Sequence, residues 1–333
     1  MNELRMERRE TNKKKWTKRI IFFILFLLFI TSVYGVFVFY KTKSALDNAQ
    51  VDLNREGDKS ELREEAVNIG SNPISILLMG VERYSTGDKD GRADTQIVMT
   101  LNPNTNEMAM VTIPRDTRVN IENAGEYSGI HKINSAYTYG SITGYGAEKL
   151  QVETIEKLLN IPIDKFVAID FDGFRDIIDA IGGVNIDIKE GFWEKNIYNN
   201  DEKIYFTPGQ DKLNGEEALA FVRMRLRDVN LTYSRDERQR QLIEALIKQF
   251  ISAGTIFKVD KITSILGENI DTDLSAEEIY ILQQQYSKIN KSTIKTILIG
   301  GQDQYVNGSS YFIPEESGIE EVSQQLRESL ELK

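Results

Sequence analysis

An uncharged run of 21 residues, Ile20–Tyr40, limits most strongly how this chain can fold. A bilayer core of about 30 Å takes about 20 apolar residues in a helix, so this run is long enough to span a membrane. Eight lysines and arginines precede it, and acids such as Asp47 and Asp52 follow it. This charge distribution predicts a cytoplasmic N-terminus and an extracytoplasmic body, as in a single-pass type II protein of the cell membrane.

A cleaved signal peptide is the alternative for this run. Signal peptides have an apolar core of about 7–15 residues and a small-residue cleavage site, whereas this run is longer and no Ala-x-Ala follows it. We therefore predict a cytoplasmic basic tail over residues 1–19, one transmembrane helix over 20–40, an extracytoplasmic stalk over 41–72 and one folded domain over 73–333. The other interpretation of the predicted stalk is a helix packed on the edge of the domain.

Cysteine, histidine and charge narrow the chemistry of the body. The chain has no cysteine, which excludes disulfides, a thiol nucleophile and Cys-ligated metals. Its only histidine is His131, so multi-histidine metal sites are excluded. Eight basic and three acidic residues give residues 1–40 a charge of +5, and since the whole chain carries −10, residues 41–333 carry −15. Such an acidic body disfavours nonspecific binding of nucleic acid, so its arginine clusters need a local explanation.

Strand and helix patterns alternate along the body. Ile74–Val81 is a continuous apolar run, which is typical of a strand covered on both faces. The alternation predicts an α/β domain with a mixed central sheet. Further strands are predicted at Gln96–Leu101, Met108–Ile113, Lys165–Asp170, Val184–Ile188 and Thr293–Ile299, and helices at Ala147–Leu159, at Phe174–Ile181, from Ser275 and at Glu315–Leu330.

The stretch Phe221–Arg227 alternates apolar residues with arginines. Side chains of a strand point alternately to its two faces, so we expect a strand with Arg223, Arg225 and Arg227 on one face. Three neighbouring guanidinium groups repel one another. The pattern therefore predicts an anionic ligand on that face.

A helix start follows the predicted arginine strand. Ser234 and Glu237 form a Ser-x-x-Glu capping box, which places Arg235, Arg238 and Gln239 in the first turns of the helix. Helix N-termini favour anions, and arginine pairs bidentately with phosphate. We expect a phosphate or pyrophosphate site here, whereas ordinary surface salt bridges are the alternative.

Acids and bases follow two of the predicted strands. Glu82 and Asp94 lie at the two ends of a glycine-containing loop, and both could reach one Mg²⁺, which prefers one or two carboxylates plus phosphate oxygens and water. Ordinary loop acids are the other interpretation of this pair. Arg115 lies where the predicted strand Met108–Ile113 ends, and Asp116 could orient it. Lys132, in a nearby glycine-bearing loop, is a candidate phosphate contact.

Several of these stretches, taken in order, resemble the LytR-CpsA-Psr family of Gram-positive cell-envelope proteins. The resemblance implies a three-layer α/β/α domain that holds a polyprenyl (pyro)phosphate lipid in a hydrophobic pocket. It also implies Mg²⁺-assisted transfer of a teichoic acid or similar anionic glycopolymer from that lipid to peptidoglycan. The matching stretches are Ile76–Val81, Gly91–Thr95, Ile113–Thr117, Lys132–Asn134, Gly182–Val184 and Phe221–Arg225, followed by Arg235 and Arg238–Gln239.

The resemblance also assigns residues. By position, Asp94 matches a metal-site aspartate of the family. The family usually has Asp where this chain has Glu82, and it often has an acid shortly before the position of Arg235, where this chain has Leu231–Ser234. The residues that match its phosphate contacts are Arg92, Arg115, Arg223, Arg225, Arg235 and Gln239.

The predicted mechanism is phosphoryl transfer, in which a peptidoglycan hydroxyl attacks the sugar-proximal phosphorus of the lipid pyrophosphate. Arginines grip the pyrophosphate, so catalysis is mainly positioning and electrostatics. Either Asp94 or Asp116 could serve as the base. The two rival hypotheses are a non-catalytic, polyprenyl-phosphate-binding regulator and a lipid pyrophosphatase.

Overall fold

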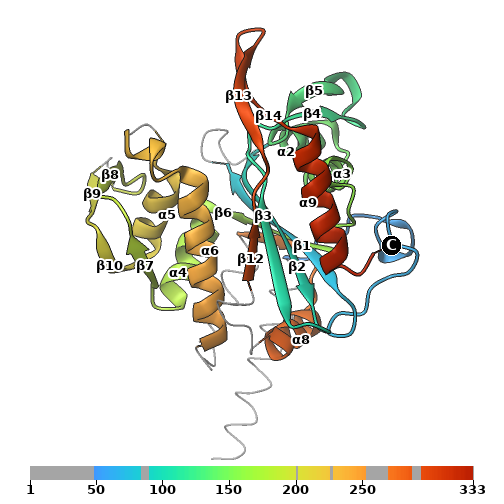
Figure 1. Cartoon of the computed structure of the whole chain (residues 1–333), viewed down its shortest axis with the longest axis horizontal. Helices are drawn as coiled ribbons and strands as arrows, with labels where there is room; N and C mark the ends of the chain where they lie inside the picture. Colours follow the sequence, from blue (N-terminus) through green and yellow to red (C-terminus); the bar gives the residue numbers. More distant parts are fainter. Residues whose placement is uncertain are drawn as a thin grey trace, which may run out of the picture.

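A six-stranded mixed sheet forms the centre of the computed structural model, which describes residues 49–83, 90–199, 202–225, 228–252, 269–286 and 294–332 (Figure 1). Parallel pairing joins β1 to β6 and β3 to β12, and the other neighbours are antiparallel. The prediction of a mixed central sheet is therefore confirmed. In order across the sheet, the strands are β11 (Ile270–Thr272), β6 (Lys165–Asp170), β1 (Ile74–Glu82), β2 (Arg92–Asn102), β3 (Glu107–Thr112) and β12 (Ile294–Ile297).

Apolar side chains fill both faces of this sheet, because successive residues of a strand point to opposite sides. Leu77 and Met79 of β1 belong to a core that includes α3 and α9, whereas Ile76 belongs to a second core on the other face. Ile243 of α6 and Ile281 of α8 pack against that second core. The helices are α2 (Ser135–Thr143), α3 (Ala147–Leu159), α6 (Arg235–Ser252), α8 (Ala276–Tyr286) and α9 (Glu316–Ser329).

A third apolar core lies in a smaller part of the molecule, seen on the left of Figure 1. Ile178, Ile186, Phe206 and Phe221 are buried in it. Two small antiparallel sheets support this core, so the predicted strand Val184–Ile188 exists but does not join the main sheet. The elements here are α4 (Phe171–Ala180), β7 (Val184–Ile188), β8 (Phe192–Lys195), β9 (Lys203–Phe206), β10 (Gly209–Leu213) and α5 (Gly215–Arg223).

The predicted arginine strand, Phe221–Arg227, is wrong. Residues Phe221–Arg223 form the last turn of α5. A capping box starts this helix: the Asn214 side chain accepts a hydrogen bond from the Glu217 amide (3.0 Å), and the Glu217 carboxylate accepts one from the Asn214 amide (2.8 Å). The alternation of apolar residues and arginines therefore spans the end of α5 and does not indicate a strand. Residues 226 and 227 lie outside the described part.

Residues 49–72 pack along the edge of the domain. Leu53 belongs to the main core, and the Val51 amide donates to the Thr272 carbonyl at 2.9 Å. Arg63 Nη2 lies 2.6 Å from Asp164 Oδ2, with only 9% and 2% of the two side chains exposed. The described part of the predicted stalk is therefore not a separate spacer. Its packing at the domain edge fits the alternative interpretation, although Glu56–Asp58 is only a short 3-10 turn.

Two hairpins complete the fold at the upper edge of the sheet in Figure 1. One consists of β4 (Arg118–Ile121) and β5 (Gly129–Lys132), and the other of β13 (Gly301–Val306) and β14 (Ser309–Pro314). The second hairpin is fixed at its base, where the Phe312 amide donates to the Asp116 carbonyl at 2.9 Å.

Among the residues described, no helix has the length and apolar character needed to cross a bilayer. The predicted transmembrane helix over 20–40 lies outside the described residues, as does the predicted cytoplasmic tail.

Candidate active site

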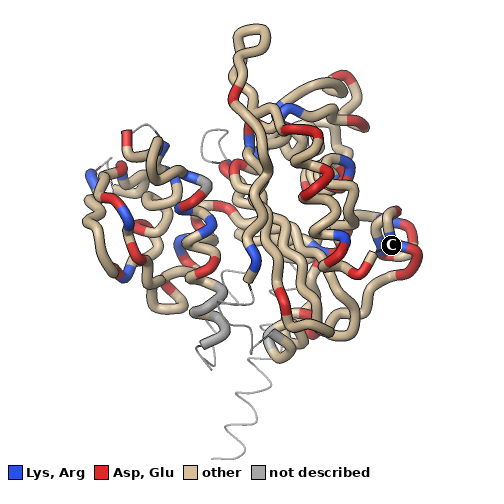
Figure 2. Tube along the Cα trace, in the orientation of Figure 1, with Lys and Arg blue, Asp and Glu red and all other residues tan. Residues whose placement is uncertain are grey.

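Strand ends from four chain segments meet at the upper edge of the sheet. Because β1, β3 and β6 run in the same direction and β2 runs against them, the C-terminal ends of the first three lie beside the N-terminal end of β2. Open α/β sheets commonly bind ligands at such an edge. Basic and acidic residues lie close together there (Figure 2).

Asp94 occupies a β-bulge in β2. Thr95 pairs with Gly80 and Ala93 pairs with Val81, so Asp94 between them has no partner on β1. A bulge of this kind turns a side chain away from the regular alternation of the strand. The bulge is fixed on both sides, because Gln96 Nε2 donates to the Ala93 carbonyl (2.8 Å) and Gln239 Nε2 donates to Thr95 Oγ1 (3.0 Å).

The Asp94 carboxylate is held by two side chains from other elements. Arg115, just after β3, donates from Nη1 to Asp94 Oδ2. Asn134, which precedes α2, donates from Nδ2 to Asp94 Oδ1 at 2.9 Å. Both residues are candidates from the sequence, and the structure pairs them directly. The contribution of Asn134 was missed, although the stretch that contains it carried part of the family resemblance.

Asp116 extends this group of ion pairs. Its carboxylate lies 3.6 Å from Arg115 Nε, 2.8 Å from Lys132 Nζ and 3.8 Å from Arg225 Nη2. The predicted orienting role of Asp116 toward Arg115 agrees with this geometry. We call Asp94, Arg115, Asp116, Lys132 and Arg225 the rim cluster. It carries three cations against two anions, so a further anion beside it would be stabilised.

The pKa of Asp116 bears on its chemical role. Burial alone would raise this pKa, but the hydrogen bond from Lys132 and the charges of Arg115, Lys132 and Arg225 hold it below its ordinary value. Asp116 is therefore ionised at neutral pH and is a weak proton acceptor. Its place among three cations suits it to orienting them.

Three other predicted phosphate ligands lie on separate elements. Arg92 begins β2, is exposed and pairs in register with Glu82, the last residue of β1. The Arg223 guanidinium carbon lies 5.4 Å from the centre of the Phe171 ring, at the start of α4. Arg235 is the first residue of α6 and is partly buried.

Arg238 does not contact ligand from this position, and the prediction of a phosphate contact is wrong for this residue. Its side chain is fully buried. The guanidinium donates to the backbone carbonyls of Phe221 (2.9 Å), Met224 and Tyr233. These bonds satisfy carbonyl groups at the end of α5 and before α6, so Arg238 joins the two helices.

The region around Asp94 offers few carboxylates as metal ligands. Among the described residues, no group of three or more His, Asp or Glu side chains has metal-site geometry. Asp94 offers one carboxylate, and Glu82 lies at the neighbouring strand end. This donor set fits Mg²⁺ only in the form that phosphate-handling sites use, with one or two carboxylates completed by phosphate oxygens and water.

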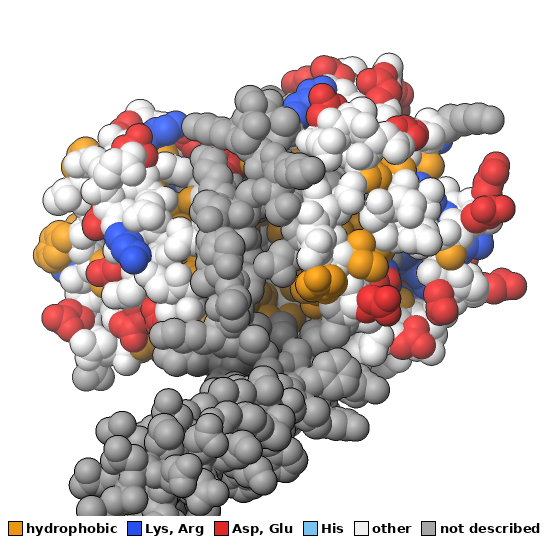
Figure 3. Space-filling view, turned by 90° about the horizontal axis from the view of Figure 1, so that it is seen from below, with side chains coloured by type: hydrophobic (Ala, Val, Ile, Leu, Met, Phe, Trp, Pro, Cys, Tyr) orange, Lys and Arg blue, Asp and Glu red, His pale blue; other side chains and the backbone are white. Residues whose placement is uncertain are grey.

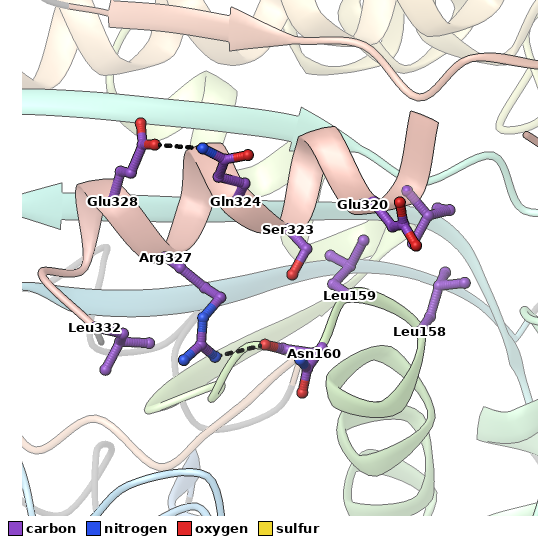
Figure 4. Close-up of a pocket in the computed structure, with 10 residues that line it drawn as sticks. Leu158, Leu159, Asn160, Glu320, Ser323, Gln324, Arg327, Glu328 and Leu332 are labelled. Carbon is purple, nitrogen blue, oxygen red and sulfur yellow. Dashed lines mark hydrogen bonds between the residues drawn. The ribbon is translucent and has the colours of Figure 1, made fainter. Parts of the chain in front are cut away.

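A different pocket lies between α3 and α9, the helices that cover one face of the sheet (Figure 4). There Arg327 Nη1 donates to the Asn160 carbonyl at 3.1 Å, and Gln324 Nε2 donates to Glu328 Oε1 at 2.9 Å. Ser329, near the end of α9, bonds to Thr100 on β2 at 2.6 Å. These contacts are typical of helix packing, so we do not assign chemistry to this pocket.

Comparison with known proteins decides the family. The LytR_cpsA_psr family profile matches residues 36–328, which include every residue of the rim cluster. The chain belongs to the LytR_cpsA_psr family. Among members of this family, the Bacillus subtilis (strain 168) protein named polyisoprenyl-teichoic acid–peptidoglycan teichoic acid transferase TagV is 42% identical over 321 residues, covering 96% of this chain and 80% of the relative.

Solved structures of LytR_cpsA_psr proteins share the fold. The crystal structure of B. subtilis TagV superposes with a TM-score of 0.68 at 42% identity, covering 79% of this chain and 99% of TagV. A structure described as TagT bound to LIIa-WTA superposes with a TM-score of 0.69 at 28% identity, covering 85% of this chain and all of TagT. The mixed α/β architecture described above is thus that of the family.

Proposed function

We propose that this chain is a transferase that moves a teichoic-acid-type polymer from a polyprenyl-pyrophosphate carrier to peptidoglycan. The observation that carries the proposal is the rim cluster, in which cations from three separate chain segments surround Asp94 and Asp116 within an otherwise acidic body. The relatives named above as teichoic acid transferases support the same activity.

The pyrophosphate would lie against the rim cluster. Arg225 is half exposed, with 52% of its side chain accessible, and its 3.8 Å separation from Asp116 leaves room to turn toward a ligand. Arg115 is held by Asp94 and Asp116, so its guanidinium is already oriented. Arginine recognises phosphate bidentately, and orientation before binding lowers the entropic cost.

An apolar region beside the rim suits the lipid chain of the carrier. Ile97, Met99 and Met110 form part of the core on the sheet face toward α6 and α8. Seen from below, the side on which α8 lies, hydrophobic side chains reach the surface on the larger part of the molecule (Figure 3). We propose that the lipid enters from that side, with the membrane anchor at Ile20–Tyr40 holding the domain outside the cell.

The transfer forms one bond and breaks another. An acceptor hydroxyl oxygen attacks the sugar-proximal phosphorus, the bridging P–O bond breaks, and polyprenyl phosphate leaves. The hydroxyl proton passes to solvent or to a carboxylate, and the lowered pKa of Asp116 makes this residue a weak acceptor for it. Arg115 and Arg225 stabilise charge on the phosphate oxygens, which is the main contribution of proteins to phosphoryl transfer.

We also propose Mg²⁺ as the cofactor, with Asp94 as its carboxylate ligand and Glu82 as a second. When bound, Mg²⁺ would neutralise negative charge on the phosphate oxygens. Asn134 donates to Asp94 Oδ1 and would orient the carboxylate for this task, while Arg115, which donates to Oδ2, would share that oxygen with the metal.

The test is transfer by the full-length protein in detergent, with lipid-linked polymer, peptidoglycan and Mg²⁺. We expect Arg115→Ala and Arg225→Ala each to lower kcat/KM by about a hundredfold or more, as for other removals of charge-stabilising groups. Arg327→Ala, in the pocket between α3 and α9, is the matched control and should transfer like the parent. Equal transfer by all four proteins would contradict the assignment.

Product analysis separates the rival functions. A lipid pyrophosphatase would release free phosphorylated polymer without peptidoglycan, whereas a regulator would bind the lipid without turnover. The proposed transferase forms polymer-bearing peptidoglycan and needs the acceptor.

A further inference from the structure

We propose that a cavity beside the rim cluster is a binding site for an uncharged sugar unit, adjoining the phosphate that is transferred. The inference deepens the proposed function, on which it rests, by assigning a place to a glycan component of one of the two substrates. The cavity has a volume of about 480 Å³ and lies between the ends of β1 and β2 and the helices α2 and α3. This volume is within the range of small-ligand sites, roughly 300–1,000 Å³.

The lining of the cavity is rich in groups that bind hydroxyls. Asp90, Tyr137, Ser141 and Glu148 contribute carboxylates and hydroxyls, and glycines expose backbone between them. A carboxylate accepts hydrogen bonds from neighbouring hydroxyls, and the oxygen of a serine hydroxyl can accept one while its proton is donated elsewhere. The space beside Gly144 is open, since a Cβ at this position would meet no atom within 4 Å.

Both carboxylates are already oriented. Ser141 Oγ donates to Asp90 Oδ1 at 2.6 Å, and Tyr137 Oη donates to Glu148 Oε1 at 2.7 Å. Each of these bonds uses one oxygen of its carboxylate. Burial, followed by the charge of Glu148, raises the pKa of Tyr137, which keeps this phenol protonated as a donor. Groups held in place in this way bind with a smaller entropic cost.

The charge of the cavity excludes the anionic parts of the substrates. Among the described lining residues, Asp90 and Glu148 face one cation, Arg83, which is itself paired with Asp271 (2.8 Å) and lies 3.9 Å from Asp170. Phosphate would be repelled here, in contrast to the rim cluster. An uncharged hydroxyl-rich ligand suits this lining better than phosphate or a carboxylate-bearing chain.

The cavity is also connected to the reacting region. Thr138 Oγ1 donates to the carbonyl of Gly91 at 2.8 Å, and Gly91 lies directly before Arg92 at the start of β2. Tyr137 follows Asn134, the partner of Asp94, by three residues, so the two lie about one helical turn apart. A sugar in the cavity would therefore lie close to the transferred phosphate.

A binding titration tests the site without requiring transfer. Full-length protein in detergent is titrated with a chito-oligosaccharide tetramer, an uncharged stand-in for the glycan. We expect saturable binding by the parent that Asp90→Asn, Glu148→Gln and Ser141→Ala each weaken by about tenfold. The amide variants retain an acceptor for Ser141 and Tyr137, so their thermal unfolding should match that of the parent.

Glu107→Gln, at the opposite end of the sheet, is the control and should bind like the parent. No binding by the parent, or equal binding by every variant, overturns the proposal. In the transfer assay, a raised KM for peptidoglycan alone assigns the site to the acceptor, and a raised KM for the lipid-linked polymer alone assigns it to the donor. If the parent binds the tetramer through these residues but transfers no polymer, the proposed function fails while the sugar site stands.

Discussion

At the scale of single residues, burial separates arginines that look alike in the sequence. Arg115 and Arg238 both occur in stretches that match the family, yet Arg115 faces the carboxylates of the rim cluster and Arg238 is fully buried among backbone carbonyls. The sequence predicts that Arg115 lies at a strand end beside Asp116, and the family resemblance assigns Asp94 to the same site, but their direct ion pair was not predicted. It does not predict the burial of Arg238, because the packed face of α6 depends on where α5 lies.

The structural role of Arg238 gives a prediction on stability. Arg238→Met should lower the free energy of unfolding by about 3 kcal/mol or more, since three buried carbonyls lose a donor and each costs about 1–3 kcal/mol. Chemical denaturation of the purified protein measures this change. Arg240→Met, two residues further along α6 and only partly buried, should change stability by less than about 0.5 kcal/mol. Equal losses of unfolding free energy in both variants would show that the hydrogen bonds of Arg238 do not hold α5 against α6.

At the scale of elements, one capping box explains why the residues before Met224 form a helix and not the predicted strand. Alternation over Phe221–Arg227 favours a strand, but Asn214 and Glu217 start α5 upstream of it, and the helix continues to Arg223. That signal was present in the sequence. The bulge at Asp94 was not predictable, because it depends on the register between β1 and β2.

The bulge gives a prediction on positioning. Gln96 and Gln151 are fully buried; Gln151 donates to Gln96 at 3.1 Å, and Gln96 donates to the carbonyl before Asp94. Gln96→Met should cost about 1–3 kcal/mol of stability and lower kcat of transfer, with little change in KM, because Asp94 loses its fixed orientation.

Thr100→Val is the control on the same strand. It removes the bond to Ser329 at the opposite end of β2, so it should lose stability without losing kcat in the remaining folded enzyme. Adding Gln151→Leu to Gln96→Met should cost less than the sum of the two single changes, which a double-mutant cycle measures. Additive losses, or a kcat equal to that of the parent, would contradict the positioning role.

At the scale of the whole molecule, the fold places an electropositive cluster and an apolar sheet face side by side. Most strands of the main sheet, and α3, α4, α6, α8 and α9, follow from hydrophobic periodicity and caps. Strand β7 was predicted as well, whereas its partner β10, the pair β8–β9 and the hairpin β13–β14 were not, because short exposed strands carry weak patterns. Arg115 and Asp116 of the rim cluster follow β3, one of the longer strands. Their position was therefore predicted despite the error at α5.

The central claim, that the rim cluster holds the charged head of a lipid carrier, is tested most directly by equilibrium binding. The measurement compares the Kd of the full-length protein for a polyprenyl pyrophosphate with its Kd for the uncharged polyprenol of the same chain length. We predict at least about tenfold tighter binding of the pyrophosphate, and loss of most of that difference in Arg115→Ala. Equal Kd values for the two lipids in the parent protein would contradict the account.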